Sequence, residues 1–371
     1  MHDGVVNHGQ TKVAVARVVA AIGLALAPVV VTAASPWSAV TGVIVLGMMP
    51  TMSAAAAGSR AMVASTVASV ATAFVAVLFG SAGGWTPVLG ALLVMLLAQA
   101  TGRLSPRGLH PIGAATIAIA AYLLVDPSSV LGALGDSASP LAAAGLVSGL
   151  VAISCGWVVA VSACLLPKRR SAQSAAGDQL GGQPAAPGSV PVEPVAPAPV
   201  GVEEAATTAS LPYSTLLAGV CGILTLICLL WLPGTNSWWA VLTAAVILQP
   251  TRGDTRARLL GRIVGTVLGG TTAALLVLVL PSGWLPALGL ASALATIALL
   301  LTGAAYWKYS LAVTVTVILT TFQPSAALAG DLQRVLVTVA AAGVTAGAVW
   351  VSSRLAPASA QPSGNEEATL G

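Results

Sequence analysis

The chain has 371 residues, of which 57% are hydrophobic and only 7% are charged, and its mean hydropathy is +0.93. Soluble proteins carry roughly 25% charged residues, so this composition excludes a water-soluble fold and predicts an all-α polytopic membrane protein in a lipid bilayer. The net charge of +4 does not indicate a nucleic-acid partner, because the basic residues stand at the ends of apolar runs and not on one soluble face.

Twelve apolar runs are predicted to be transmembrane helices, in two groups of six. The first group comprises residues 13–34, 37–57, 61–80, 86–100, 111–125 and 141–166. The second group comprises residues 213–232, 238–250, 262–280, 284–302, 309–322 and 332–354. The short runs 86–100, 238–250 and 309–322 are expected to extend into flanking residues or to be buried in the bundle. The first run is long enough to cross a bilayer, which argues against a cleavable signal peptide.

Polar segments divide the chain into five parts. These are a cytoplasmic N-terminal tail (1–12), a first six-helix unit (13–166), a linker (167–212), a second six-helix unit (213–356) and a C-terminal tail (357–371). The linker is rich in Pro, Ala, Gly and Ser and nearly free of large apolar side chains, so we expect it to be disordered and cytoplasmic. The same composition predicts a disordered C-terminal tail.

The two six-helix units share landmarks at offsets of 197 to 202 residues. The matching positions are Trp37 and Trp238, Pro50 and Pro250, Arg60 and Arg262, Thr101-Gly102 and Thr302-Gly303, and Asp126-Pro-Ser and Gln323-Pro-Ser. Six spans per unit give both units the same orientation, so the sequence predicts two parallel repeats with any pathway at or near their interface.

The basic residues predict that both termini are cytoplasmic. With the N-terminus inside, 14 of the 15 Lys and Arg residues lie on the cytoplasmic side. They are Lys12, Arg17, Arg60, Arg103, Arg107, Lys168, Arg169, Arg170, Arg252, Arg256, Arg258, Arg262, Lys308 and Arg354. Only Arg334 is left outside, and it is expected either to pair with Asp331 where the last helix starts or to mark the exit of an anion path.

The basic turn after Gln249-Pro250 carries the strongest candidate site. We expect Asp254 or Thr255 to cap the returning helix. Along that helix one face carries Arg258, Arg262, Thr266 and Gly270, and an adjacent stripe of Gly261, Gly265 and Gly269 predicts close packing against another helix. The polar face is interpreted either as the wall of a substrate path or as cationic anchors for lipid phosphates. Arg262 is the best functional candidate because it lies deepest and has a repeat partner in Arg60.

Aromatic residues stand at both ends of the spans. Trp238 and Trp239 are expected at the outer interface, either as membrane anchors or as stacking partners of an aromatic substrate. The cluster Tyr306-Trp-Lys-Tyr309 at the inner face has the same two interpretations. His110 is expected in a solvated inner loop.

Motifs of enzymes and metal sites are not found. The chain has no phosphate-binding Gly-x-x-x-x-Gly-Lys loop, no His-Glu-x-x-His and no Gly-x-Ser-x-Gly nucleophile elbow, so we predict no enzyme activity and no cofactor. The four cysteines, Cys155, Cys164, Cys221 and Cys228, fall in apolar runs without metal-ligand spacing, and are expected to be buried as small apolar side chains without a metal.

The stretch 236–281 resembles a known family. It contains Trp239-x-x-Leu-Thr, then Gln249-Pro, then Arg252-Gly-Asp-Thr, then Arg258-Leu-Leu-Gly-Arg-Ile-Val-Gly-Thr-x-x-Gly269. This order resembles the integral-membrane transporter domain of the fusaric acid resistance family, also called the aromatic acid exporter family. Arg262, Gly265 and Thr266 fall on its Arg-x-x-Gly-Thr pattern. The linker here is short, whereas many members carry sizeable cytoplasmic domains.

The resemblance implies a bacterial inner-membrane exporter of aromatic carboxylates driven by the proton gradient, with distant kinship to plant anion channels in which two six-helix units enclose a pore. We therefore expect a transporter that exports organic anions, with substrate-binding residues Arg262, Arg258, Thr266, Arg60, Trp238 and Trp239. A passive anion channel and a non-transporting membrane scaffold remain open alternatives.

Overall fold

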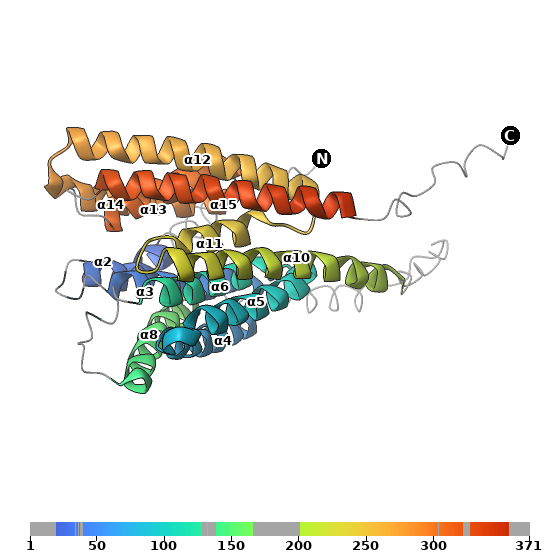
Figure 1. Ribbon diagram of the computed structural model, residues 1–371. Helices are drawn as coiled ribbons and strands as arrows, with labels where there is room; N and C mark the ends of the chain where they lie inside the picture. Colours follow the sequence, from blue (N-terminus) through green and yellow to red (C-terminus); the bar gives the residue numbers. More distant parts are fainter. Residues whose placement is uncertain are drawn as a thin grey trace, which may run out of the picture.

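The computed structural model describes residues 20–127 without 34, 36, 38 and 39, residue 132, and residues 139–165, 201–302, 304–321 and 327–355. The secondary structure of these residues is helical, without a strand. The helices are α2 (Ala27–Ala33), α3 (Thr41–Ala54), α4 (Ser59–Gly80), α5 (Thr86–Leu104), α6 (His110–Val125), α8 (Pro140–Leu165), α10 (Gly201–Trp231), α11 (Trp238–Ile247), α12 (Arg252–Val279), α13 (Leu285–Leu301), α14 (Tyr306–Thr321) and α15 (Ala327–Leu355). In Figure 1, α12 and α15 run along one side of the molecule, α4, α5 and α8 along the other, and α10 and α11 between them.

The prediction of an all-helical, multi-pass membrane protein is confirmed. In the described part of the chain, six helices are long and apolar enough to cross a bilayer: Ser59–Gly80, Gly83–Arg107, Pro140–Leu165, Tyr213–Trp231, Arg252–Val279 and Leu332–Arg354. Six shorter apolar helices cover the other predicted runs: Ala20–Ala33, Thr41–Ala54, His110–Val125, Trp238–Ile247, Ala287–Thr296 and Tyr306–Leu319. Two of the three short runs extend as expected, because α5 continues to Leu104 and α14 begins at Tyr306.

The helix α11 lies at the centre of the fold and is only 10 residues long. At 1.5 Å per residue it spans about 15 Å, roughly half of the hydrocarbon core. It packs against α6, α10, α12 and α15, and every residue except Leu242 and Val246 is buried. The expectation that this short run is buried in the bundle is therefore confirmed.

The C-terminal end of α11 is set by Pro250. The position before a proline disfavours the helical conformation, and the chain is already extended at Leu248, with φ −63° and ψ 122°. The Leu248 carbonyl therefore accepts no helical hydrogen bond, but it accepts hydrogen bonds from the Tyr213 hydroxyl at 3.1 Å and from Gln249 Nε2 at 2.8 Å. Non-helical backbone at this depth is tolerated because protein groups satisfy it.

The two halves of the chain meet mainly where α5 packs against α10. The contact is antiparallel and close along its whole length. A β-carbon on Gly102 would stand 2.4 Å from Ser214 Cα, one on Gly222 2.2 Å from Met95 Cγ, and one on Gly90 2.8 Å from Leu229 Cδ1. Glycines at both ends and on both helices let the backbones approach, as in other membrane helix pairs.

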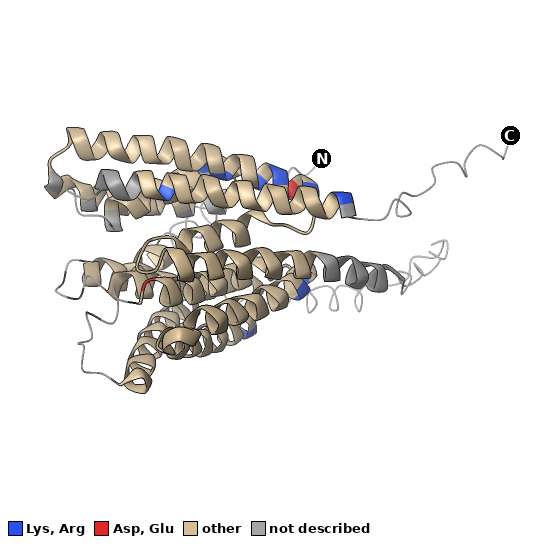
Figure 2. Ribbon diagram, viewed as in Figure 1, with Lys and Arg blue, Asp and Glu red and all other residues tan. Residues whose placement is uncertain are grey.

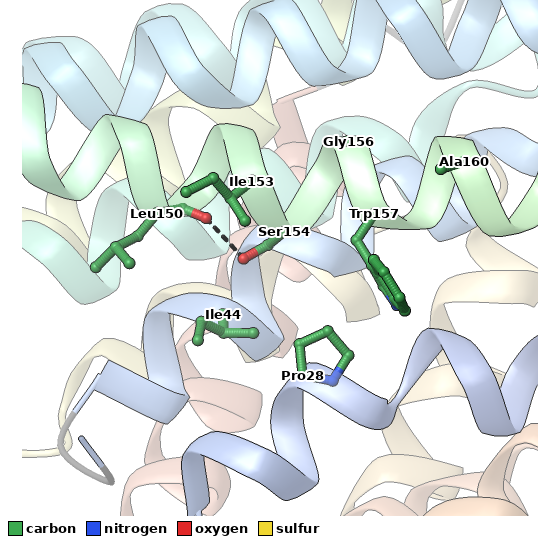
Figure 3. Close-up of a pocket in the computed structure, with 8 residues that line it drawn as sticks. All are labelled: Pro28, Ile44, Leu150, Ile153, Ser154, Gly156, Trp157 and Ala160. Carbon is green, nitrogen blue, oxygen red and sulfur yellow. Dashed lines mark hydrogen bonds between the residues drawn. The ribbon is translucent and has the colours of Figure 1, made fainter. Parts of the chain in front are cut away.

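The first helix is broken at Pro28, and the carbonyl group that the break frees accepts a hydrogen bond from another helix. Pro28 has no N–H, so it leaves the carbonyl of Leu24, four residues earlier, without its helical hydrogen bond. Trp157 of α8 fills that role, since its indole N–H donates to the Leu24 carbonyl at 2.9 Å. An apolar pocket of about 300 Å³ lies beside this contact (Figure 3). It is lined by Pro28, Ile44, Leu150, Ile153, Ser154, Gly156, Trp157 and Ala160.

Residues 1–12, 167–200 and 357–371, assigned above to the tails and most of the linker, lie outside the described residues. The helix α10 begins at Gly201, so the stretch 201–212 is helical where the sequence analysis placed the end of a disordered linker. Its sequence Gly-Val-Glu-Glu-Ala-Ala-Thr-Thr-Ala-Ser contains strong helix formers.

Candidate functional site

The candidate site is built on α12, and its N-terminus is capped differently from the prediction. The N-cap is Thr251, whose side-chain oxygen accepts from the Asp254 backbone N–H at 3.1 Å and donates to Asp254 Oδ2 at 2.6 Å. The assignment of Asp254 or Thr255 as the cap was wrong, because Thr-x-x-Asp resembles a capping box that begins three residues earlier. Thr255 instead binds the carbonyl of Gln249 at 3.2 Å and that of Thr251 at 3.0 Å.

The glycine stripe of α12 packs against α14, as predicted. A β-carbon on Gly261 would stand 2.8 Å from Tyr306 Cδ1, one on Gly265 2.6 Å from the Trp307 carbonyl, and one on Gly269 2.7 Å from the Leu311 carbonyl. This close approach fixes which way the neighbouring polar face points. The buried residues beside the stripe are Arg262, Thr266, Gly270 and Ala273.

The four arginines of the basic turn have two different environments. Arg252 and Arg256 are exposed, as expected for residues that reach lipid phosphates. Arg258 is half-buried, and Arg262 is only 4% exposed. The interpretation of all four as lipid anchors is therefore wrong for Arg262.

Arg258 and Arg262 form an inner cluster with two tyrosines of α14. The Arg258 guanidinium lies 5.6 Å from the ring centroid of Tyr306, and the rings of Tyr306 and Tyr309 are 6.0 Å apart. Three buried polar atoms here make no hydrogen bond: Arg262 Nε, the Tyr306 hydroxyl and Thr266 Oγ1. Buried polar groups normally have partners, so this cluster is suited to a polar ligand or to water.

His110 belongs to the edge of this site, which corrects the prediction of a solvated loop residue. It is the first residue of α6 and only 6% exposed. Its ring centroid is 6.4 Å from that of Tyr213, and it is near enough to Arg258 for an electrostatic interaction. The sequence signal was weak because a single histidine before an apolar run does not reveal that the broken end of α11 covers it.

Trp238 and Trp239 are buried, at 5% and 7% exposure, and so do not lie in the lipid interface as expected. Their rings stack on each other at 4.1 Å with an interplanar angle of 27°. Trp238 also meets Tyr122 of α6 edge to face at 5.2 Å. On the other side, the Arg334 guanidinium lies 4.0 Å from the centroid of Trp239. We call these four residues the outer stack.

Arg334 is 1% exposed, although the sequence placed it at the start of the last helix. The helix α15 begins at Ala327, so Arg334 is two turns inside it and does not cap its start. A cation over an indole face is attracted by the ring quadrupole, more strongly where water is excluded. Tyr122 was not among the predicted candidate residues, whereas Arg334 was named as a possible exit of an anion path. Nothing near either residue in the sequence indicated its contact with the tandem tryptophans.

Arg60 does not join the inner cluster. It is exposed at the start of α4, a helix that packs mainly against α8, α6 and α3, whereas α12 packs mainly against α14 and α15. Among the described residues, Figure 2 shows most of the Lys and Arg side chains towards the end of the bundle where α12 begins and α15 ends. Among the described cysteines, Cys155, Cys221 and Cys228 are buried as predicted and Cys164 is exposed.

Residues 220–352 match the family model described as fusaric acid resistance protein-like. This part of the chain is similar to that family. The match confirms the resemblance inferred from Trp239 to Gly269 and extends it from α10 to α15. A search of curated proteins and a search of solved structures each gave no match.

Proposed function

We propose that this membrane protein is a transporter that exports small organic anions, with aromatic carboxylates as the leading substrate class. The inner cluster carries the proposal. A buried guanidinium in a membrane protein is costly and usually faces a partner, a cavity or a solute path. Arg262 supplies that charge, and the tyrosine rings beside it suit a planar carboxylate.

We also propose that the halves are parallel six-helix repeats with cytoplasmic termini. Helix contacts support the repeat: α4 with α8, α3 with α8, α4 with α6 and α5 with α6 have the counterparts α12 with α15, α11 with α15, α12 with α14 and α13 with α14. The last helix of each half also carries a Gly-x-x-x-Gly pair at one offset, Gly145 and Gly149 in α8 and Gly343 and Gly347 in α15.

The proposed direction is export from a bacterial cytoplasm across the inner membrane. An interior-negative potential moves each monovalent anion outwards by about 2.3 kcal/mol per 100 mV, which is roughly a fiftyfold concentration ratio. Among the described side chains, the acidic residues are Asp126 and Asp254, and both stand at helix ends. Their positions favour a passive channel as the second candidate, because neither is placed to carry a proton across the bilayer.

Uptake of radiolabelled benzoate into inverted membrane vesicles, which corresponds to export from the cell, tests the proposal. Arg262→Gln is expected to lower uptake into the vesicles at least about tenfold, as for a charge-assisted contact of about 1.5 kcal/mol or more. Arg262→Lys keeps a charge but loses the planar fork, and should be intermediate. Arg256→Gln and Arg60→Gln, which change exposed residues, are matched controls. Equal uptake by all four variants and the wild type would remove Arg262 from the mechanism.

Planar-bilayer recording separates the two flux mechanisms. Anion currents that persist without a pH gradient favour the channel, and pH-dependent uptake without current favours a coupled exporter. A non-transporting scaffold predicts neither. The burial of Arg262 speaks against the scaffold, since a scaffold would turn that side chain to lipid headgroups.

A further inference from the structure

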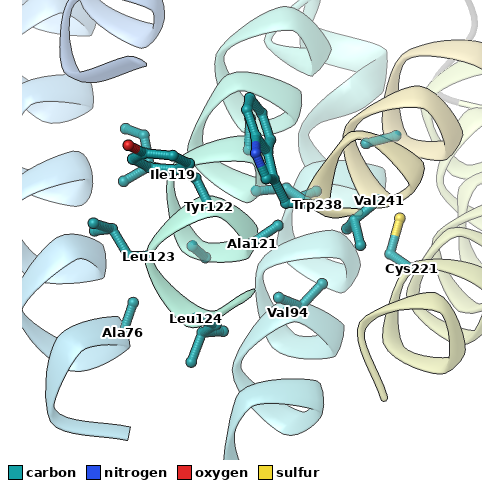
Figure 4. Close-up of a cluster of buried hydrophobic side chains, with 14 of the residues drawn as sticks. Ala76, Val94, Ile119, Ala121, Tyr122, Leu123, Leu124, Cys221, Trp238 and Val241 are labelled. Atoms are coloured by element: carbon teal, nitrogen blue, oxygen red, sulfur yellow. The ribbon is translucent and has the colours of Figure 1, made fainter. Parts of the chain in front are cut away.

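The surface between the two halves is closed by apolar packing. One cluster of buried side chains crosses it without a gap, from Val94 of α5 and Tyr122 of α6 to Cys221 of α10 and Trp238 and Val241 of α11 (Figure 4). At the outer end, the Gly234 backbone N–H donates to the Val125 carbonyl at 2.8 Å, which ties the halves together. An anion path along this surface would have to separate a packed core.

The face of α11 that lies towards α15 carries a buried polar side chain. Trp239, Thr243 and Ile247 follow one another at intervals of four residues and so form one stripe, and Trp239 in this stripe meets Arg334 of α15. Thr243 is fully buried, and its hydroxyl oxygen makes no hydrogen bond. A threonine hydroxyl in a helix usually bonds the preceding turn, so an unsatisfied one marks a place for water or a polar solute.

The helix α12 presents a matching polar surface. Its glycines face α14, and the adjacent face carries Arg262 and, one turn further out, Thr266, whose hydroxyl oxygen is also buried without a hydrogen bond. The other neighbours of α12 are α15 and α11. Thr338 of α15 is buried one turn from Arg334. Buried polar side chains of α11, α12 and α15 therefore lie inside the second half of the chain.

Two buried arginines stand at the two ends of this polar interior. Arg262 lies ten residues into α12, about 15 Å from its inner end. Arg334 lies twenty residues before Arg354 on the returning helix α15, about 30 Å from that same end. The difference of about 15 Å equals the length of α11. Two separate sites of this kind suit a solute path, because conduction through several weak sites allows a solute both to enter and to leave.

We propose that the anion path runs inside the second half, along the Trp239–Thr243 face of α11, from Arg262 to Arg334, and not between the halves. Arg334 is then a second, outer binding residue, held against Trp239 until an anion arrives. The first half acts as the wall behind α11. This inference rests on the proposed function for its solute, but the position of the path can be measured without transport.

Cysteine accessibility measures that position. In the full-length protein with Cys164→Ser, which removes the exposed thiol, single substitutions Thr243→Cys, Thr266→Cys and Thr338→Cys are nearly isosteric reporters of the path. We expect a small, membrane-impermeant methanethiosulfonate to label them, and benzoate to slow the labelling. Thr271→Cys and Thr272→Cys, exposed on the outside of α12, are the lipid-facing controls and should stay unlabelled. The native Cys221 and Cys228 report on the surface between the halves and should also stay unlabelled.

Labelling of Cys221 or Cys228 with the three reporters silent would place the path between the halves and overturn the inference. Silence at every position, in variants that elute as folded protein in detergent, would overturn it as well. If the reporters are labelled but vesicles take up no benzoate, the polar path stands and the proposed substrate class fails. If benzoate uptake is normal but only the interface is labelled, the function stands and this path fails.

Discussion

The close packing of α12 on α14 can be tested with a single added methyl group, Gly265→Ala. A β-carbon at this position would stand 2.5 Å from Ser310 Cβ and 2.6 Å from the Trp307 carbonyl oxygen. Non-bonded carbons settle at about 3.5–4.0 Å, so the two helices must separate locally by about 1 Å. Overpacking costs about 1–3 kcal/mol, and the upper part of this range is expected because a backbone carbonyl cannot rotate away.

The assay is thermal unfolding in detergent, followed by loss of the monodisperse peak or by tryptophan fluorescence. With roughly 2 °C of melting temperature per kcal/mol in larger domains, Gly265→Ala should melt about 4–6 °C below the wild type. The matched control is Gly343→Ala on α15, where a β-carbon meets no atom within 4 Å. That variant should melt at or slightly above the wild-type temperature, because alanine favours a helix more than glycine does. Equal melting temperatures for the two variants would refute the packing argument.

Two further predictions concern hydrogen bonds far from α14. Trp157→Phe leaves the Leu24 carbonyl without its hydrogen-bond donor and should destabilise the protein by about 1–3 kcal/mol. In a Pro28→Ala background, the N–H of residue 28 can bond the Leu24 carbonyl, so Trp157→Phe should there be nearly neutral. Equal losses of stability in both backgrounds would contradict this account of the kink. Thr251→Ala removes the cap of α12 and should lower the stability by about 0.5–2 kcal/mol in the same melting assay. Thr271→Ala, on the exposed face of that helix, should leave the melting temperature unchanged. An unchanged melting temperature for Thr251→Ala would show that the Asp254 N–H finds another acceptor.

The helices and their approximate bounds could be predicted because long apolar runs have one solution in a bilayer. Every described α-helix overlaps a predicted run, although α10 and α12 begin ten or more residues earlier than their runs, and the glycines of α12 pack as their spacing indicated. Neither result needs knowledge of distant neighbours, since hydropathy and the four-residue spacing are local properties of the sequence. The capping threonine, Thr251, was also readable locally, but the capping pattern was assigned three residues too late.

The candidate site depended on neighbours that the sequence does not reveal. Trp37 and Trp238 occupy equivalent places in the proposed repeat, yet Trp37 is 57% exposed and Trp238 is 5% exposed. A tryptophan at a helix end suits a lipid interface on local grounds. What removes Trp238 from the interface is Tyr122, more than one hundred residues earlier in the chain. His110 was misplaced for the same reason, because Tyr213 and the end of α11 cover it.

The contrast between Arg60 and Arg262 follows from the helices that precede them. The helix α3 runs through Pro50 to Ala54 and continues in a short 3-10 turn to Ala57, and Gly58 with φ +101° then lets α4 begin beside solvent. The helix α11 instead stops at Ile247, and the non-helical residues Leu248 and Gln249 are held by hydrogen bonds to the side chains of Tyr213 and Thr255. Because α11 ends early and the following residues are held by the protein, the first turns of α12 lie further inwards and Arg262 is buried. The short helix α11 therefore accounts for both features on which the proposed anion path rests: the buried Arg262 beyond its C-terminal end and the outer stack at its N-terminal end.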